Sequence, residues 1–197
     1  MKVSPKFLVA TLATFLAGAA TVQADVIQAP GAVWEYTFST PSDVNWKTGA
    51  GGGFATGAAP FSNQGSGDFG ANTFWGADGS DGVDVYLRRT IDLTGYDLST
   101  IAWDLGVDNG FALYANGFLV GSDNAEGFTS RWEYTGAFGS SLVAGINYIA
   151  VELEDHGGAT AFDMQIRGER STSVPDTGST LGLLLLSAGL LAAVRRK

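Results

Sequence analysis

Apolar side chains alternate with other residues in four stretches of this 197-residue chain, with one break at Arg89, and the alternation limits what the chain can fold into. The alternating residues are Val85, Leu87, Ile91 and Leu93; Ile101, Trp103, Leu105 and Val107; Ile149, Val151 and Leu153; and Phe162, Met164 and Ile166. A period of two turns one face of a strand to a core and the other to water, as in antiparallel sheets. Residues 25–170 have no long apolar stripe of helical period, so we predict an all-β domain.

Turn residues punctuate these strands. Asn116-Gly117 stands between Phe111–Ala115 and Phe118–Val120, and it favours a two-residue hairpin because both positions of a type I′ turn need positive φ. Short strands separated by glycine-rich turns are typical of sandwiches and barrels, and we predict a two-layer antiparallel β-sandwich. Residues 48–82, rich in Gly and Ala with interspersed aromatics, are expected to form long loops pinned by those aromatics.

The first 24 residues have the pattern of a secretory signal peptide. Lys2 and Lys6 precede an apolar run from Phe7 to Ala20, and small residues precede a cleavage position between Ala24 and Asp25. The run is shorter than the roughly 20 residues that a permanent membrane helix needs. We therefore predict an export signal, in helical form, and not an anchor.

The C-terminus has a similar layout. Residues 171–180 comprise a small polar linker and a candidate sorting motif, and they are followed by an apolar run, Leu181–Val194, and the basic tail Arg195-Arg196-Lys197. Fourteen residues of helix extend about 21 Å, less than the ~30 Å hydrocarbon core. The basic tail would stop on the cytoplasmic side. We expect residues 181–197 to insert transiently as a transmembrane sorting helix, which is then cleaved off.

Here the residues carry a resemblance. The motif Val174, Pro175, Asp176, Thr177 and Gly178, followed by a leucine-rich run and a basic tail, resembles the PEP-CTERM class of bacterial sorting signals in its VPDSG-type variant. The resemblance covers residues 174–197. It implies processing by an exosortase-like membrane protease and delivery to the cell surface or extracellular matrix of a bacterium. It also implies an association with bacteria that build exopolysaccharide.

Two departures leave an alternative open. Asp176 and Thr177 stand where the class's name-giving motif has Glu and a second Pro. The sequence VPDTG also overlaps the LPxTG pattern read by sortases, with Val174 in place of Leu. A sortase would cut after Thr177 and link it to the cell wall, so the mature C-terminus distinguishes the two routes.

The body of the chain, residues 25–170, carries a second and wider resemblance. An "YLRR" strand, a strand ending in Asp-Asn-Gly, a Tyr-Ala-Asn-Gly hairpin and a Gly-Ile-Asn-Tyr-Ile-Ala-Val strand follow one another between Trp46 and Gly168. This order resembles the galactose-binding-like jelly roll of carbohydrate-binding modules and of accessory domains in glycosidases. The resemblance implies the same sandwich fold and a sugar as candidate ligand, although many members of that fold bind none.

Composition excludes several classes of function. The chain has no Cys, which removes thiol nucleophiles, disulfides and Cys-ligated metals. Residues 25–170 hold six of the eleven Lys and Arg and nineteen of the twenty acids, a formal charge near −13, so nucleic acid is not an expected partner. His156 is the single imidazole, and no Gly-x-Ser-x-Gly elbow is present. We therefore expect a non-catalytic domain.

Three acids with regular spacing form a candidate calcium site. Asp78, Asp81 and Asp84 recur at every third position in a Gly-rich segment, and calcium takes six to eight oxygen ligands from such loops. The spacing does not match an EF-hand. Structural calcium is thus the one candidate cofactor, and a solvated acidic loop without metal is the alternative.

A candidate sugar platform combines aromatic rings with polar groups. Trp75 and Trp132 would offer apolar faces, while Asp108, Asn109 and Arg131 would bond hydroxyl groups. The alternative is that the aromatics belong to the core, as expected for Trp34 and Trp103 and as an alternative for Trp132. Arg88 and Arg89 are adjacent in a predicted strand, so they should face opposite sides, with one of them paired to a carboxylate.

These expectations combine into one prediction. The chain should be a secreted, C-terminally sorted surface or matrix protein with a non-catalytic β-sandwich and exopolysaccharide as candidate ligand. A structural or adhesive protein that binds another protein is the first alternative, and a small glycan-active enzyme is the second.

Overall fold

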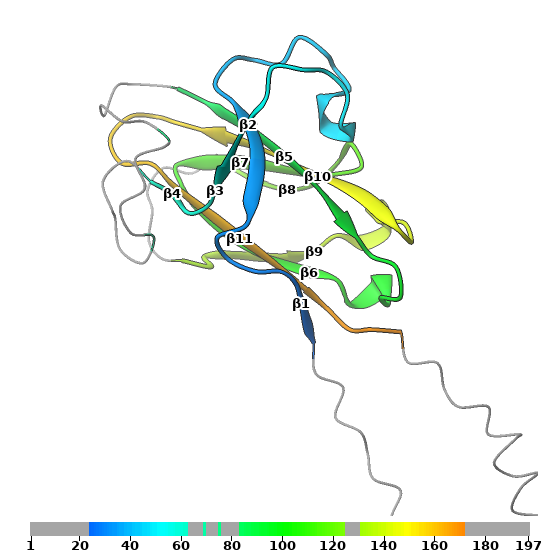
Figure 1. Ribbon diagram of the computed structural model, residues 1–197. Coiled ribbons are helices and arrows are strands. Elements are labelled where there is room, and N and C mark those ends of the chain that lie inside the picture. Colours follow the sequence, from blue (N-terminus) through cyan, green and yellow to red (C-terminus); the bar gives the residue numbers. More distant parts are fainter. Residues whose placement is uncertain (1–23, 63–68, 70–74, 76–82, 125–130, 172–197) are drawn as a thin grey trace, which may run out of the picture.

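The computed structural model describes residues 24–62, 69, 75, 83–124 and 131–171, and these form two antiparallel β-sheets packed face to face (Figure 1). The five-stranded sheet has the order β1-β11-β6-β9, with β4 also paired to β11. Its strands are β1 (Asp25–Gln28), β4 (Phe61–Ser62), β6 (Ala102–Asp108), β9 (Tyr134–Ala137) and β11 (Ala161–Gly168).

The second sheet has six strands in the order β3-β2-β5-β10-β7-β8. They are β2 (Val33–Thr37), β3 (Ala55–Ala58), β5 (Val85–Asp92), β7 (Gly110–Ala115), β8 (Phe118–Asp123) and β10 (Ile146–Glu154). Three short 3₁₀ turns complete the described elements: η1 (Trp46–Thr48), η3 (Leu98–Thr100) and η4 (Gly139–Ser141). Late strands insert between early ones, as β10 does between β5 and β7, and the jelly-roll-like β-sandwich predicted from the sequence is confirmed.

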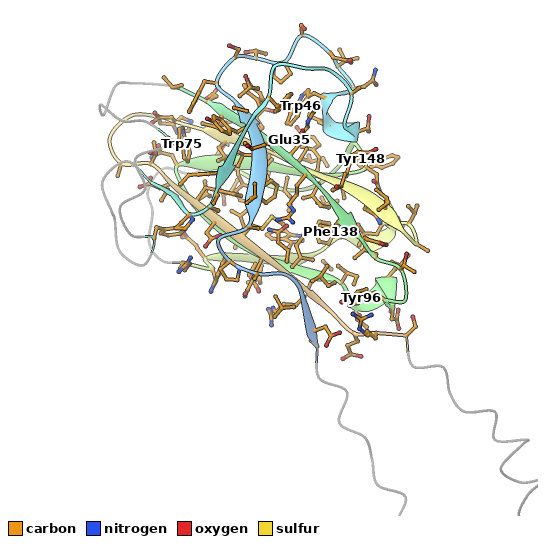
Figure 2. All side chains as sticks on the ribbon, in the orientation of Figure 1. Glu35, Trp46, Trp75, Tyr96, Phe138 and Tyr148 are labelled. Carbon is orange, nitrogen blue, oxygen red and sulfur yellow. The ribbon has the colours of Figure 1, made fainter. Side chains whose placement is uncertain are left out.

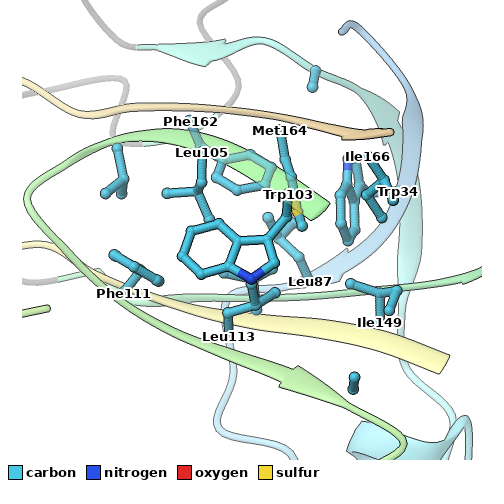
Figure 3. Close-up of a cluster of buried hydrophobic side chains, with 14 of the residues drawn as sticks. Trp34, Leu87, Trp103, Leu105, Phe111, Leu113, Ile149, Phe162, Met164 and Ile166 are labelled. Carbon is cyan, nitrogen blue, oxygen red and sulfur yellow. The ribbon is translucent and has the colours of Figure 1, made fainter. Parts of the chain in front are cut away.

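The core lies between the sheets and uses the alternating residues (Figure 3). All fourteen predicted core positions in the four stretches have 5% or less of their surface exposed. Trp34 and Trp103, expected in the core, are 1% and 5% exposed. The Trp103 ring lies so close to β9 that a Cβ on Gly136 would come within 2.4 Å of it, so only glycine fits there.

The predicted hairpin is also present. Asn116 and Gly117 have φ of 50° and 83°, and they join β7 to β8 with Ala115 paired to Phe118. Asn116 further ties the turn to the neighbouring loop, because its side-chain amide donates to Ser141 O and to Asn147 Oδ1, both at 2.8 Å.

The outer face of the six-stranded sheet differs from the expectation of a wet face. The segment between β2 and β3 folds over it and places Trp46 edge-on to Tyr86 and stacked with Phe54. As a result Tyr86 and Arg88 are 7% and 9% exposed. The prediction of a buried inner face is confirmed, but the prediction of a solvated outer face is wrong here. The covering loop forms a small second apolar cluster on the outer face.

The region expected to be loop contains two short strands. β3 and β4 are four and two residues long, and they pair with β2 and β11. Three residues of β3 are exposed and the other is half-buried, so it shows no alternating signal. Such strands owe their structure to pairing partners far away in sequence, which local pattern does not reveal.

Both ends of the sandwich body lie side by side at one end of the molecule (Figure 1). Asp25 in β1 pairs with Gly168 in β11, and Arg170 forms an ion pair with Asp25 at 2.8 Å. The expected signal and sorting segments lie outside the described residues, but both join the body at this end. No helix in the described parts of the chain is long and apolar enough to cross a membrane.

Candidate functional site

The predicted sugar-binding residues lie where β6, β10 and β11 meet the loops at the end opposite the termini. Asp108 and Asn109 follow β6 and are joined by a cis peptide bond, with 6% and 8% of their surfaces exposed. Asn109 Oδ1 accepts a hydrogen bond from His156 N at 3.0 Å. Burial, followed by the charges of Asp155 and Glu133, raises the pKa of Asp108 to about 6. This carboxyl group is therefore poorly solvated, and its role as a ligand remains a prediction.

Arg131 and Trp132 adjoin the same end but are engaged within the protein. Arg131 forms an ion pair with the fully buried Asp163, and its guanidinium lies over the rings of Phe69 and Trp132 at 5.4 and 5.2 Å from their centroids. Trp132 is half-buried and has a positive φ of 65°. These contacts place Arg131 as a bridge between the sheet and a loop.

Trp75 is a correction to the predicted platform. Its side chain is fully buried, its Nε1 donates to Val83 O at 2.8 Å, and its carbonyl accepts from Thr160 Oγ1 at 2.8 Å. Trp75 therefore belongs to the core, as the alternative interpretation held, and has no ring face to offer a sugar.

The candidate calcium residues are only partly covered by the structure. Asp78 and Asp81 lie outside the described residues. Asp84 is described, and its Oδ1 accepts from Asp155 N at 3.3 Å. No group of three or more acids or histidines within the described residues is arranged to hold a metal ion. Calcium at Asp78, Asp81 and Asp84 stays a prediction.

A cavity of about 300 Å³ lies elsewhere, where β2 and β5 separate on the six-stranded sheet. The ladder between them runs only from Thr37–Tyr86 to Glu35–Arg88 and does not continue to Val33 or Thr90. Residues of both faces consequently line the cavity. From the outer face these are Val33, Glu35, Thr56, Arg88, Thr90 and Tyr148, with Gly49 from the covering loop. From the inner face they are Trp34 and Arg89.

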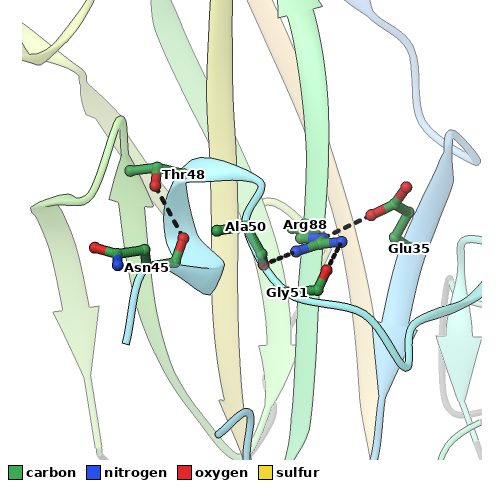
Figure 4. A network of polar contacts seen from close by, with 6 residues as sticks. All are labelled: Glu35, Asn45, Thr48, Ala50, Gly51 and Arg88. Atoms are coloured by element: carbon green, nitrogen blue, oxygen red, sulfur yellow. Dashed lines mark hydrogen bonds and ion pairs between the residues drawn. The ribbon is translucent and has the colours of Figure 1, made fainter. Parts of the chain in front are cut away.

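Arg88 fixes one wall of this cavity (Figure 4). Its Nε donates to Glu35 Oε2 at 2.6 Å, while Nη1 and Nη2 donate to the carbonyl oxygens of Ala50 and Gly51. Its guanidinium also lies 3.9 Å from the Phe54 ring centroid. The covering loop is thereby tied to β5 and β2, and the expected pairing of one adjacent arginine with a carboxylate is confirmed.

Tyr148 forms another wall and comes from β10, where it pairs with Thr90 of β5. Figure 2 shows Tyr148, Glu35 and Trp46 on the side of the molecule formed by the six-stranded sheet and its covering loop. Gly49, at φ 86°, lies against the tyrosine ring so closely that a Cβ would come within 2.3 Å of it. An aromatic ring, two threonines and an ion pair therefore surround one small cavity.

Sequence reasoning missed this cavity. The adjacent arginines in a predicted strand gave a signal, since one of them had to face inward among apolar residues. The separation of β2 from β5 had no signal, because it depends on how strands distant in sequence pair.

Comparisons with known proteins bear on both resemblances: a family model matches the C-terminal motif, and solved structures match the fold of the body. The family model described as the VPDSG-CTERM motif matches residues 173–197, so the chain carries a PEP-CTERM-type sorting signal at its C-terminus. The match covers the predicted motif Val174–Gly178. No curated protein sequence matches the chain.

Solved structures with similar folds include parts of β-glucuronidases. The Ruminococcus gnavus enzyme in complex with N1-substituted uronic isofagomine aligns at 9% identity and a TM-score of 0.52 over 79% of this chain and 31% of that one. The same enzyme with D-glucuronic acid gives 9% identity, a TM-score of 0.51 and the same coverages. The Bifidobacterium dentium enzyme with coumarin-3-O-glucuronide aligns at 18% identity and a TM-score of 0.48 over 69% and 21%. The aligned region covers less than a third of each of these enzymes, and the two matches to the Ruminococcus gnavus enzyme show a shared sandwich fold.

Proposed function

We propose that this protein is a non-catalytic surface or matrix protein whose β-sandwich binds extracellular polysaccharide through the cavity between β2 and β5. The C-terminal sorting motif indicates export to the cell surface. Exosortase processing and transient membrane insertion of residues 181–197 are part of the proposal. The resemblance to PEP-CTERM signals implies bacteria that build exopolysaccharide, and this polymer is the proposed ligand.

The observation that carries the proposal is the composition of the cavity. Sugar rings need an apolar or aromatic face together with a few placed polar groups, and binding sites for small ligands begin at about 300 Å³. Here Tyr148 and Val33 supply apolar surface, and Glu35, Thr56 and Thr90 supply polar groups. The cavity volume of about 300 Å³ suits a single sugar residue within a longer chain.

The same composition favours binding over catalysis. Glycosidases flank the scissile bond with two carboxyl groups. Glu35 is the one carboxylate among the described residues that line the cavity, and it is held in an ion pair with Arg88. His156, at the end of the body opposite the termini, lies 3.4 Å from Glu154 and does not line the cavity. The fold shared with parts of β-glucuronidases supports a carbohydrate-related setting but names no ligand.

Co-sedimentation of the secreted protein with the producing cell's own extracellular polysaccharide tests the proposal. Tyr148→Ala should weaken binding roughly five- to thirtyfold, the loss typical of an aromatic anchor. Phe118→Ala removes an aromatic that is 66% exposed on β8, away from the cavity, and should bind like the wild type. A reducing-end assay on the same mixtures should show no turnover. Retention of full affinity by Tyr148→Ala in a folded protein would contradict the assignment.

A second candidate, adhesion to another protein, is favoured by a different surface. Phe118, Leu119, Val143 and Ile146 are each at least 55% exposed. The hairpin that carries the first two is tied to the segment carrying the others by the bonds of Asn116. If the protein acts this way, Phe118→Ala and not Tyr148→Ala should abolish association in light scattering.

A further inference from the structure

Arg89 stands apart from the other cations of the sandwich body. Four arginines form ion pairs with carboxylates: Arg88 with Glu35, Arg131 with Asp163, Arg167 with Asp104 and Arg170 with Asp25. Lys47 lies over the rings of Tyr114 and Trp46. Arg89 has no ion pair and no side-chain hydrogen bond among the described residues, in a body where acids outnumber cations about threefold.

The position of Arg89 explains why no acid reaches it. On β5 it follows Leu87 in the alternation that faces the core, while Arg88 faces the covering loop. Its guanidinium lies 5.6 Å from the ring centroid of Trp34, the residue that faces inward from β2. Because the two strands separate here, both residues line the cavity.

Donor groups of the two residues that line this part of the cavity lack acceptors. Arg89 Nε and Nη1 and Trp34 Nε1 are all buried, and none has a hydrogen-bond partner. Buried polar groups are nearly always paired, and an exception calls for a ligand, ion or water. Burial lowers the pKa of Arg89 because desolvation penalises the charged form, yet a guanidinium stays protonated at neutral pH. What is missing is an acceptor with negative charge.

We infer that the cavity selects a carboxylate-bearing sugar, a hexuronate residue of an acidic polysaccharide, with Arg89 as the group that holds the carboxylate. A planar carboxylate matches the fork of an arginine, which binds it with two parallel hydrogen bonds. Glu35, Thr56 and Thr90, on the outer side of the same cavity, are placed to bond the hydroxyl groups of the ring. This inference rests on the proposed polysaccharide binding and specifies the class of polymer.

The charge of the chain sharpens the selection. The formal charge near −13 of residues 25–170 repels polyanions in general, so an acidic polymer should not adsorb to the secreted protein through diffuse attraction. A close contact with Arg89 acts at short range, whereas the repulsion is screened beyond about 8 Å at physiological ionic strength. Binding of a polyuronate should therefore depend on the local contact with Arg89 and not on the overall charge.

The test compares defined polymers and matched variants of the secreted protein. Polygalacturonate and alginate carry carboxylates, dextran sulfate carries sulfates, and dextran is neutral. The wild type should bind at least one of the two polyuronates at least tenfold more tightly than dextran or dextran sulfate. Arg89→Gln should lose about tenfold or more, as for a charge-assisted bond. Arg170→Gln makes the same change of charge at an exposed site beyond the end of β11 and should bind as the wild type does.

Thermal melts separate binding from a structural role. Arg89→Gln removes a buried charge without a partner, so its melting temperature should equal or exceed that of the wild type. D-Glucuronate or D-galacturonate should raise the melting temperature of the wild type but not that of Arg89→Gln. A marked loss of stability in Arg89→Gln, with polyuronate affinity retained, would overturn the inference.

The remaining outcomes are equally informative. Equal binding of dextran and polyuronates would overturn the carboxylate selection and leave polysaccharide binding standing. Equal binding of dextran sulfate and polyuronates would show selection for any anion and would also overturn it. Failure to bind any polysaccharide, including the producing cell's own, would overturn the proposed function together with the inference.

Discussion

Asp108 shows how a single buried carboxyl group contributes to the pH dependence of stability. It lies at the end of β6 with 6% of its surface exposed, and its pKa is raised to about 6 by burial and by Asp155 and Glu133. A raised carboxyl pKa means that the folded state resists ionisation. The stabilisation is fully present below the ordinary value near 4 and is lost as the pH rises through about 6.

Asp108→Asn should therefore stabilise the protein at neutral pH. The shift from 3.8 to about 6 corresponds to about 3 kcal/mol as an upper bound, and a gain of about 1–2 kcal/mol at pH 8 is expected after the new amide is accommodated. Urea unfolding at pH 4 and pH 8 measures it, and the gain should vanish at pH 4. A gain that is the same at both pH values would contradict this account.

Asp104 gives the matched comparison. It is 4% exposed, but its carboxylate accepts from Arg167 and from Gln165. Asp104→Asn removes one partner of a buried pair and should cost about 1–3 kcal/mol at pH 8. Two buried aspartates on one strand thus respond with opposite signs, because one has counter-charges and the other has acids for neighbours.

At the scale of elements, the segment that covers the six-stranded sheet connects packing to the cavity. η1 supplies Trp46, which is 5% exposed against Tyr86, and the carbonyls of Ala50 and Gly51 beyond it hold Arg88. The covering segment is therefore held by the aromatic contacts of Trp46 and by the bonds of Arg88. It in turn positions Gly49 against Tyr148 at the cavity wall.

Trp46→Ala should loosen this cover without unfolding the sandwich core. Deleting a buried tryptophan costs about 3–5 kcal/mol when the surroundings cannot collapse. Compared with the wild type, hydrogen exchange should become faster in residues 46–51 and stay unchanged in β10 and β11. The polysaccharide affinity of Trp46→Ala should also fall, because Arg88 loses the carbonyl groups of Ala50 and Gly51 when the cover loosens. Unchanged exchange in residues 46–51 would refute the link between cover and cavity.

Some elements of the fold could be predicted from the sequence and others could not. Alternation located β5, β6, β10 and β11 and their inward residues, because burial on one face leaves a period of two. Asn116-Gly117 located a hairpin, because few sequences satisfy positive φ twice. The cover over Tyr86, the burial of Trp75 and the separation of β2 from β5 depend on contacts between distant segments. No alternation in the local sequence indicates such contacts.

For the whole molecule, the two termini of the body determine its orientation on a surface. β1 and β11 pair at their outer ends, so the signal and the sorting segment join the sandwich at the same end. The loops after β6 and β10 lie at the far end, and the cavity faces sideways from the six-stranded sheet. A tethered molecule would therefore present the cavity along its flank.

Mass spectrometry of the protein recovered from the cell surface tests the sorting route. The VPDSG-CTERM match predicts that the apolar run and basic tail, residues 181–197, are absent from the mature form. The chain should begin at Asp25 after removal of the signal peptide. A C-terminal Thr177 linked to cell wall would instead identify a sortase, and an uncut chain would refute processing.

NMR mapping of an added oligosaccharide tests the central claim most directly, because the cavity and the loops after β6 and β10 are far apart on the fold. The account predicts that amide signals of Gly49, Thr56, Thr90 and Tyr148 shift on titration, while those of Asp108, Asn109 and Trp132 stay in place. Shifts confined to Asp108, Asn109 and Trp132, with the cavity signals unmoved, would contradict it.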